Sequence, residues 1–168
     1  TAYRRQRQMC IRDSAYSGFL YAGLMVDASG APKVIEYNCR FGDPETQPIL
    51  LRLRSDLVEL CLAGAEVRLG EHACDWDTRA AVGVVMAAGG YPGDYRKGDV
   101  IHGLGDAEAG ECKVFHAGTA QDDQGRVVTS GGRVLCVTAL GERVSQARDR
   151  AYACLLYTSP SPRDLSTS

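Results

Sequence analysis

Apolar and polar positions in the first part of the chain are arranged in a way that predicts a β-hairpin. Residues 19–26 form an apolar run of strand length, and residues 27–32 carry the turn-forming residues Asp, Ser, Gly and Pro. Residues 33–39 then form a second strand-like segment. Because segments joined by so short a turn pair in antiparallel fashion, we expect these two strands to form a hairpin.

The hairpin segment is followed by leucines at helical spacing, at positions 50, 53, 57 and 60. Asp56 offers an N-cap, and Glu59 three residues later completes a capping-box pattern. The spacing predicts two short helices that break near Arg54. Arg52 and Arg54 could bind phosphate, although solvated charges on a helix surface are the simpler interpretation.

The second half of the chain contains short apolar segments separated by Gly and Pro turns. We expect strands at residues 80–88, 113–116, 126–129 and 133–140. A helix is expected at residues 144–153. Together with the hairpin these elements predict an α+β fold, in which a linker at residues 71–78 separates residues 16–70 from a small α+β domain at residues 79–153.

The two ends of the chain lack this patterning. Residues 1–14 hold four arginines and little apolar periodicity, while residues 154–168 end in a string rich in Ser, Thr and Pro. We expect residues 1–15 and 154–168 to be non-native or disordered tails, because they resemble translated sequencing adapters. A basic arm that binds RNA is the alternative for the first tail, but no aromatic platform supports it.

Charge and hydropathy narrow the function classes. A net charge of −2 gives no electrostatic reason to bind nucleic acid. The apolar stretch at residues 80–88 is far too short to span a bilayer, and no secretory leader opens the chain. These features predict a cytoplasmic protein that binds neither nucleic acid nor membrane.

Cysteines and histidines are not spaced as metal ligands. The seven cysteines stand at positions 10, 39, 61, 74, 112, 136 and 154, without a C-x-x-C pair. We expect reduced thiols that pack as small hydrophobes, rather than a disulfide framework or a zinc site. Structural roles are expected for the histidines at positions 72, 102 and 116.

A row of polar residues in the second predicted strand is the main candidate for chemistry. Glu36, Asn38 and Arg40 stand at every second position, so in a strand they share one face. A carboxylate and an amide at this spacing suit one or two hard cations beside a phosphate. An edge strand whose polar face meets water explains the isolated pattern about equally well.

A turn and a helix start are expected directly after this row. Gly42 permits positive φ, Asp43 can cap a helix, and Pro44 suits a first helical position. The helix should begin near Pro44, with free N–H groups suited to an anionic substrate. Glu45 in that first turn could contact substrate or compensate the helix dipole.

Two glycine-rich loops in the second half of the chain, at residues 89–93 and 130–133, could also serve an anion. Both have the backbone freedom to approach a phosphate, and Arg133 could form a bidentate pair with one. Tight turns explain both loops equally well.

Four strings of residues together resemble the phosphoribosylamine–glycine ligase family over about residues 16–153. They are I-E-Y-N-C-R-F-G-D-P-E-T-Q-P from residue 35, V-V-M-A-A-G-G-Y-P-G-D-Y from residue 84, K-V-F-H-A-G-T from residue 113 and G-G-R-V-L from residue 131. The resemblance implies the carboxyl-terminal part of an ATP-grasp domain, with antiparallel strands and helices, followed by a small α+β domain.

The resemblance also implies an activity and its groups. Enzymes of this family join glycine to 5-phosphoribosylamine with ATP as co-substrate, through a glycyl phosphate, and release glycinamide ribonucleotide, ADP and phosphate in de novo purine synthesis. The family motif gives Glu36 and Asn38 as ligands of Mg²⁺ or Mn²⁺. Arg40 is placed to stabilise developing negative charge. Contacts to substrate are expected from Asp43, Glu45 and Arg133. The expected partners are these small molecules, and a monomer is favoured.

Two other interpretations remain open. The first is another ATP-grasp carboxylate–amine ligase or carboxylase with the same metal strand, although the G-D-P-E string at residues 42–45 argues against it. The second is a non-catalytic fragment that keeps only the fold. Because the family supplies its ATP-binding lysines and a further acidic metal ligand upstream of Tyr16, the chain by itself is expected to be inactive.

Overall fold

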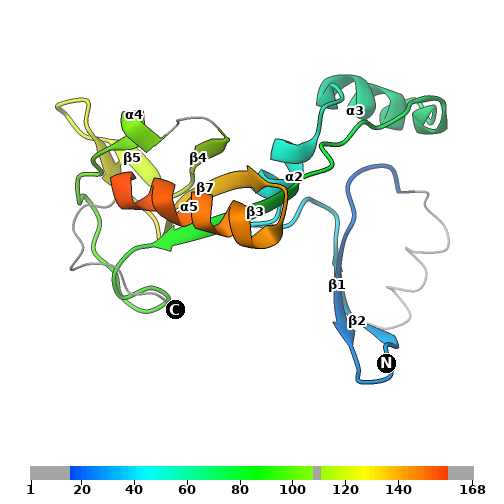
Figure 1. Ribbon diagram of the computed structural model, residues 1–168, viewed down its shortest axis with the longest axis horizontal. Helices are drawn as coiled ribbons and strands as arrows, with labels where there is room; N and C mark the ends of the chain where they lie inside the picture. Colours follow the sequence, from blue (N-terminus) through cyan, green and yellow to red (C-terminus); the bar gives the residue numbers. More distant parts are fainter. Residues whose placement is uncertain (1–15, 108–110, 159–168) are drawn as a thin grey trace, which may run out of the picture. The chain divides into compact units, whose positions relative to one another are not determined.

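The chain forms two units in the computed structural model, which describes residues 16–107 and 111–158. The first unit contains residues 16–42 and 55–75, and the second contains residues 43–54 and the chain from Trp76 onward. Antiparallel sheets and helices build both units, so the α+β class predicted from the sequence is confirmed (Figure 1).

The first unit begins with the predicted hairpin. Strands β1 (Tyr21–Val26) and β2 (Pro32–Asn38) pair in antiparallel register. Asp27 closes the turn, because its carboxylate accepts hydrogen bonds from the N–H groups of Ser29 and Ala31 at 2.9 and 3.1 Å. The register shifts once, at a β-bulge that places Gly23 opposite Glu36.

Helix α3 (Leu57–Ala65) and the short 3-10 helix η1 (Leu69–Glu71) complete the first unit. The predicted N-cap is confirmed, since Asp56 accepts hydrogen bonds from the N–H groups of Val58 and Glu59 at 2.7 and 3.2 Å. The residue after the C-cap of α3 is Val67, and it adopts a left-handed conformation with φ of 60°.

A three-stranded antiparallel sheet forms the centre of the second unit. Its strands are β3 (Ala80–Ala87), β7 (Arg133–Gly141) and β4 (Cys112–His116), with β7 in the middle. A separate small hairpin consists of β5 (Thr119–Gln121) and β6 (Val127–Thr129). Four of these five strands were predicted, whereas β5 and the four-residue helix α4 (Leu104–Ala107) were not.

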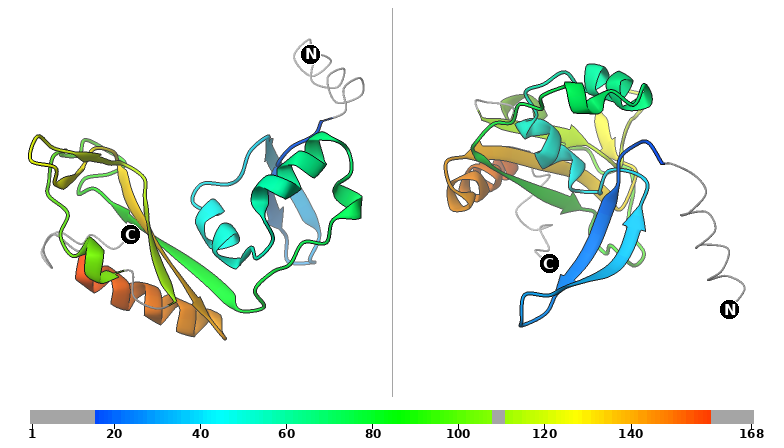
Figure 2. Two further views of the ribbon diagram at one scale, coloured as in Figure 1. Left: turned by 90° about the horizontal axis from the view of Figure 1, so that it is seen from above. Right: turned by 90° about the vertical axis from the view of Figure 1, so that its right-hand side faces the viewer.

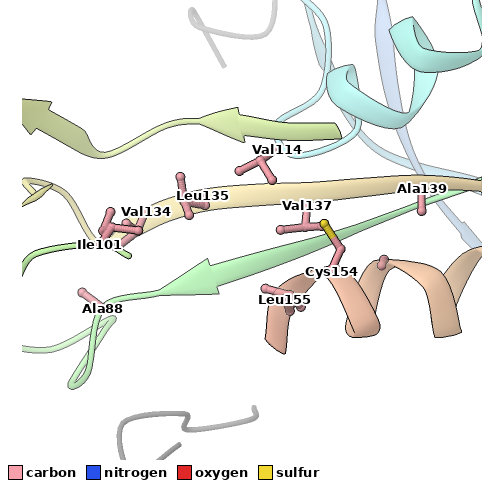
Figure 3. Packing of buried hydrophobic residues seen from close by; sticks show 10 residues of the cluster. Ala88, Ile101, Val114, Val134, Leu135, Val137, Ala139, Cys154 and Leu155 are labelled. Atoms are coloured by element: carbon pink, nitrogen blue, oxygen red, sulfur yellow. The ribbon is translucent and has the colours of Figure 1, made fainter. Parts of the chain in front are cut away.

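The core of the second unit lies between this sheet and helix α5 (Val144–Thr158), which packs along β7 and β3 (Figure 2). Leu135 and Val137 of β7 are fully buried. In Figure 3 the side chains of Val137 and Cys154 point toward one another.

Helix α5 continues past the predicted end at residue 153. Cys154 and Leu155 are buried in the core, so the tail expected from residue 154 is not disordered at these two positions, and its non-native origin remains a prediction. They extend the apolar stripe of Ala147 and Ala151 by further helical steps of three or four residues, and burial of that stripe holds the last turns against the sheet.

Helix α2 (Thr46–Arg52) packs against β3 and β7 and thus belongs to the second unit, rather than with the hairpin as expected. The predicted break between two short helices is confirmed, with α3 starting at Leu57. The start of α2 was wrongly predicted at Pro44, because Glu45 occupies the N-cap. Asp43 and Pro44 lie in a preceding turn, and the peptide bond between them is cis.

Candidate functional site

Glu36 and Asn38 lie together at the end of β2 in the first unit. Asn38 Nδ2 donates a hydrogen bond of 3.0 Å to Glu36 Oε1, so the two polar groups converge as strand alternation predicted. Glu36 is exposed and Asn38 is half-buried. An exposed carboxylate with a neighbouring amide offers oxygen ligands of the kind that Mg²⁺ and Mn²⁺ accept.

The hairpin is shaped locally around Glu36. The bulge in the β1–β2 ladder falls immediately before this residue, at Ile35. Bulges re-aim neighbouring side chains and are frequent beside functional sites. On the opposite strand, a Cβ added to Gly23 would lie 3.2 Å from Glu36 Cγ, so the glycine leaves room for the Glu36 side chain. Gly23 was not singled out from the sequence.

Arg40 does not extend the row as predicted. The ladder ends with the pair Tyr21 and Asn38, and Arg40 lies two residues farther on, in a bend. Its guanidinium donates a 2.8 Å hydrogen bond to the backbone carbonyl of Phe41. The period-two argument fails here because no partner residue of β1 remains to keep the chain extended.

Asp43 and Arg133, both predicted to contact substrate, contact each other within the second unit. Arg133 Nη1 donates to the carbonyl oxygen of Asp43 at 3.1 Å, and Nη2 donates to its Oδ2 at 2.9 Å. Asp43 does not cap the helix as expected, and instead forms one ion pair and one backbone hydrogen bond with Arg133. Glu45, the third predicted substrate contact, stands at the N-cap of α2.

The two glycine-rich loops touch each other. The N–H of Ala88 donates to the carbonyl of Gly132 at 2.8 Å, and a Cβ added to Gly132 would clash with the Tyr91 ring. This glycine is therefore required by close packing of the first loop against the second. The tight-turn interpretation accounts for it without a phosphate.

Sequence reasoning missed a charged cluster around Asp77, which was expected to lie in a linker. Asp77 is 4% exposed, and its carboxylate accepts hydrogen bonds from Arg79 and Arg54 at 2.8 and 3.1 Å. Arg52 donates to the Asp77 carbonyl oxygen, and Arg79 also pairs with Glu111. Arg52 and Arg54 are thus structural partners of Asp77 and not merely solvated charges.

The same cluster shifts the titration of its members. Hydrogen bonds from Arg79, and then from Arg54, hold the pKa of the Asp77 carboxyl well below its usual range. The carboxylates of Asp77 and Glu111 in turn raise the pKa of Arg79. The negative charge of Asp77 and the positive charges of Arg79 and Arg54 stabilise one another. Since Arg79 directly precedes β3 and Arg54 follows α2, the cluster links the start of β3 to the end of α2.

A hollow of about 610 Å³ lies in the first unit, away from the predicted residues. Phe19, Leu60 and Val67 are among its lining residues. The hydroxyl of Ser17 in its wall donates to the carbonyl of Gly64, so this polar group is already engaged. The hollow therefore presents mainly apolar surface.

Other expectations concern metals and membranes. Within the described residues, no three Asp, Glu, His or Cys side chains gather as a metal-binding group. His116 Nδ1 lies 3.0 Å from the hydroxyl of Thr119, a structural contact as predicted. Across residues 16–107 and 111–158, no helix combines the length and apolar character needed to cross a bilayer. Cys10 lies outside the described residues.

Comparison with family models places the chain in a class of proteins that contain an ATP-grasp domain. Residues 4–46 match the model of the phosphoribosylglycinamide synthetase ATP-grasp (A) domain, and residues 81–159 match that of the C domain of the same synthetase. The chain belongs to the phosphoribosylglycinamide synthetase family. Both matches reach into the segments that were set apart as tails, whose foreign origin remains a prediction.

Individual relatives agree with this assignment. The chain is 66% identical over 147 residues to a phosphoribosylamine–glycine ligase of Escherichia coli strain K12 and 64% identical to one of Vibrio cholerae. The alignment with the first relative covers 88% of this chain and 34% of that relative's length. The chain therefore spans about a third of the length of the curated relatives it matches.

Solved structures show the same relationship. The crystal structure of phosphoribosylamine–glycine ligase from Thermotoga maritima aligns with a TM-score of 0.73 at 37% identity, over 89% of this chain and 36% of that one. N5-carboxyaminoimidazole ribonucleotide synthetase from the same organism aligns with a TM-score of 0.58 at 15% identity, over 84% of this chain and 36% of that one, which is a likeness of fold alone.

Proposed function

We propose that this segment belongs to a longer enzyme that uses ATP to ligate glycine to 5-phosphoribosylamine, giving glycinamide ribonucleotide, ADP and phosphate. The carrying observation is the hydrogen-bonded pair Glu36 and Asn38, within a string of residues that resembles the family's motif. Relatives with that activity in their names, at 64–66% identity, support the proposal. The chain by itself is proposed to be inactive.

Glu36 and Asn38 would hold the divalent cation, Mg²⁺ or Mn²⁺, of this enzyme. Their polar atoms lie 3.0 Å apart, and neighbouring ligands of an octahedral cation with bonds of about 2.1 Å are separated by about 3 Å. Rotation of the Asn38 amide would present its oxygen in place of its nitrogen. Bound there, the cation would neutralise charge on the ATP phosphates.

Two further residues would act on the substrates directly. Arg40 follows the metal pair and would stabilise negative charge that develops on the transferred group. Glu45 would contact substrate from the start of α2. The partners would be ATP, glycine and phosphoribosylamine, and the enzyme would act in the cytoplasm as a monomer.

A full-length chimera tests this function. Residues 16–158 of this chain would replace the matching segment of the Escherichia coli strain K12 relative, in a strain that lacks its own ligase. The chimera should restore growth without added purine, and the purified enzyme should release ADP only when glycine and phosphoribosylamine are both present. A chimera that is folded but shows no such turnover would contradict the proposal.

The metal pair is tested in the same chimera. Glu36→Ala should abolish turnover with little change in melting temperature, because this exposed side chain adds little to folding. Lys33→Ala is the matched control, since Lys33 is an exposed residue of the same strand. Equal loss of fold and of activity in Glu36→Ala would favour a purely structural role.

A further inference from the structure

Arg133 is committed to one residue, Asp43, through two hydrogen bonds. One reaches the backbone carbonyl and the other the carboxylate, at 3.1 and 2.9 Å. A guanidinium that binds both groups of one residue fixes its orientation as well as its position. The side chains of Arg133 and Asp43 are 40% and 58% exposed, so this pair lies at the surface of the second unit.

The loop that presents Arg133 is tightly built. The N–H of Gly118 donates to the Arg133 carbonyl at 2.8 Å, and the N–H groups of Ser130 and Gly131 both donate to the Gly118 carbonyl, at 2.8 and 3.0 Å. A Cβ added to Gly118 would lie 2.6 Å from the Cα of Gly131. These N–H groups are therefore already bonded within the protein, and the glycines serve close backbone packing.

A β-bulge also directs Arg133. The ladder between β3 and β7 shifts register so that Ala87 pairs with Arg133 while Met86 pairs with Leu135, which leaves Val134 as the extra residue. A bulge turns adjacent side chains out of the regular alternation. The first residue of β7 is thereby aimed by backbone geometry as well as by its ion pair.

Both ends of the segment formed by residues 43–54 are anchored to the second unit. Arg133 holds the first residue, Asp43, and the Asp77 cluster holds Arg52 and Arg54 near the other end. Asp43 follows Arg40 by three residues in the sequence. Whatever fixes Asp43 therefore fixes one end of the turn that follows the candidate catalytic residues.

We propose that Arg133 is a positioning residue, which holds Asp43 and so presents the turn at residues 43–45, with Glu45 at its end, in one geometry. The inference rests on the proposed function. It replaces the phosphate contact expected from the sequence, because an anionic substrate would have to displace the Asp43 carboxylate from this guanidinium. Arg133 then acts on the reaction through Asp43.

Kinetics of the full-length chimera separate the two roles. Arg133→Ala should lower kcat by about tenfold or more and leave KM for phosphoribosylamine within about twofold, because a positioning contact is not a substrate contact. Asp43→Asn, which removes the charge but keeps the backbone carbonyl contact, should have a smaller effect in the same direction, and the double variant should be no worse than Arg133→Ala. Arg133→Lys should restore little, since an ammonium cannot reproduce the bidentate contact.

A matched control comes from another ion pair of the second unit. Arg126 pairs with Asp122 at 2.7 Å, and Arg126→Ala and Asp122→Asn should leave kcat unchanged. A large rise in KM for phosphoribosylamine with kcat retained in Arg133→Ala would overturn the proposal, because that result marks lost substrate binding. Additive effects of the Arg133 and Asp43 variants would also overturn it.

The ion pair can be tested without any enzyme activity. In the 168-residue chain, a double-mutant cycle of Arg133→Ala and Asp43→Asn should show a coupling of about two- to fivefold in the unfolding equilibrium constant. A coupling of zero would overturn the proposed clamp, meaning the contact by which Arg133 holds Asp43, even if the enzyme is active. If the unsubstituted chimera is inactive while the coupling is present, the proposed function fails and the clamp stands.

Discussion

The two units differ sharply in how they bury apolar surface. In the second unit the sheet and α5 enclose Leu135, Val137 and Ala139 completely. In the first unit Ala63 is the one buried apolar residue among those described, and large apolar side chains of the hairpin are exposed. These are Leu24, Met25, Val26, Val34, Ile35 and Tyr37. An isolated two-stranded hairpin is marginal in water, so we expect the first unit to be the less stable of the two.

This contrast separates the candidate chemistry from its support. Glu36 and Asn38 lie on the marginal hairpin, whereas the ion pair of Arg133 with Asp43 lies on the unit with a sealed core. Metal ligands near a strand end need a rigid surround to hold their geometry. The second unit should therefore keep its fold in the 168-residue chain when the hairpin does not.

The reactivity of the cysteine thiols should differ between the two units. Cys39, Cys61 and Cys74 of the first unit are exposed, and Cys136 and Cys154 of the second are buried. Burial also raises the pKa of the Cys136 thiol, which lowers its reactive thiolate fraction. A thiol reagent should label the first group faster by on the order of a thousandfold, because labelling of the second group requires unfolding.

Peptide mass spectrometry after timed labelling gives each rate. In denaturant the two classes should react alike, which controls for local chemistry. Labelling of Cys136 in the native chain at the rate of Cys61 would show that the second unit has no stable core.

Truncation of core side chains should have the next largest effect. Leu135→Ala should destabilise the second unit by about 3 kcal/mol, because a fully buried side chain leaves a cavity. Leu24→Ala, in the exposed part of the hairpin of the first unit, should change the stability of the second unit by less than about 0.5 kcal/mol. Urea unfolding followed by fluorescence of Trp76, the single tryptophan, reports on the second unit. Equal effects of the two variants would remove the contrast between the units.

Acid should weaken the second unit through Asp77. The pKa of this carboxyl is lowered in the folded state, so the unfolded chain binds the proton more tightly and the unfolding free energy falls as pH drops below about 4. Asp77→Asn should flatten this dependence. The effect should be smaller than that of core truncation, because solvent screens the partly exposed Arg79 and, more strongly, the largely exposed Arg54.

Unfolding midpoints measured from pH 6 to pH 2 test this expectation. Asp122→Asn is the comparison, because Arg126 likewise lowers the pKa of Asp122 at a more exposed site. A pH profile that Asp77→Asn leaves unaltered would exclude Asp77 as the group responsible.

Local patterns in the sequence predicted those parts of the fold that neighbouring residues decide. The hairpin, the Asp56 cap and the proximity of Glu36 to Asn38 each depend on residues a few positions apart. The end of β2 before Arg40 depends instead on where β1 begins, which alternation within β2 does not encode.

Long-range partners could not be predicted in the same way. Asp43 and Arg133 were both selected as candidates, but their pairing spans 90 residues and requires the folded second unit. Asp77 looked like a linker residue because its partners lie on separate elements. Ser, Thr and Pro near the chain end masked the helical spacing of Cys154 and Leu155 in the sequence. These two residues are recognised as core residues only once the sheet they pack against is known.

The smallest expected effect concerns the end of α3 in the first unit. The N–H of Arg68 donates to the Ala63 carbonyl and that of Val67 to the Gly64 carbonyl, a Schellman ending in which glycine is usual at the position of Val67. Val67 is 88% exposed, so its side chain contributes little packing to offset a left-handed φ of 60°. Val67→Gly should therefore stabilise this helix end by about 1 kcal/mol.

Hydrogen exchange of the α3 amides is the measurement, with an expected slowing of about fivefold in Val67→Gly. Val67→Ala is the control, because alanine keeps the Cβ that makes the left-handed conformation unfavourable and should gain much less. If alanine stabilises α3 as much as glycine does, backbone strain at Val67 is not the cause. If neither variant slows exchange, the first unit opens as a whole before its helix end frays, which would sharpen its contrast with the second unit.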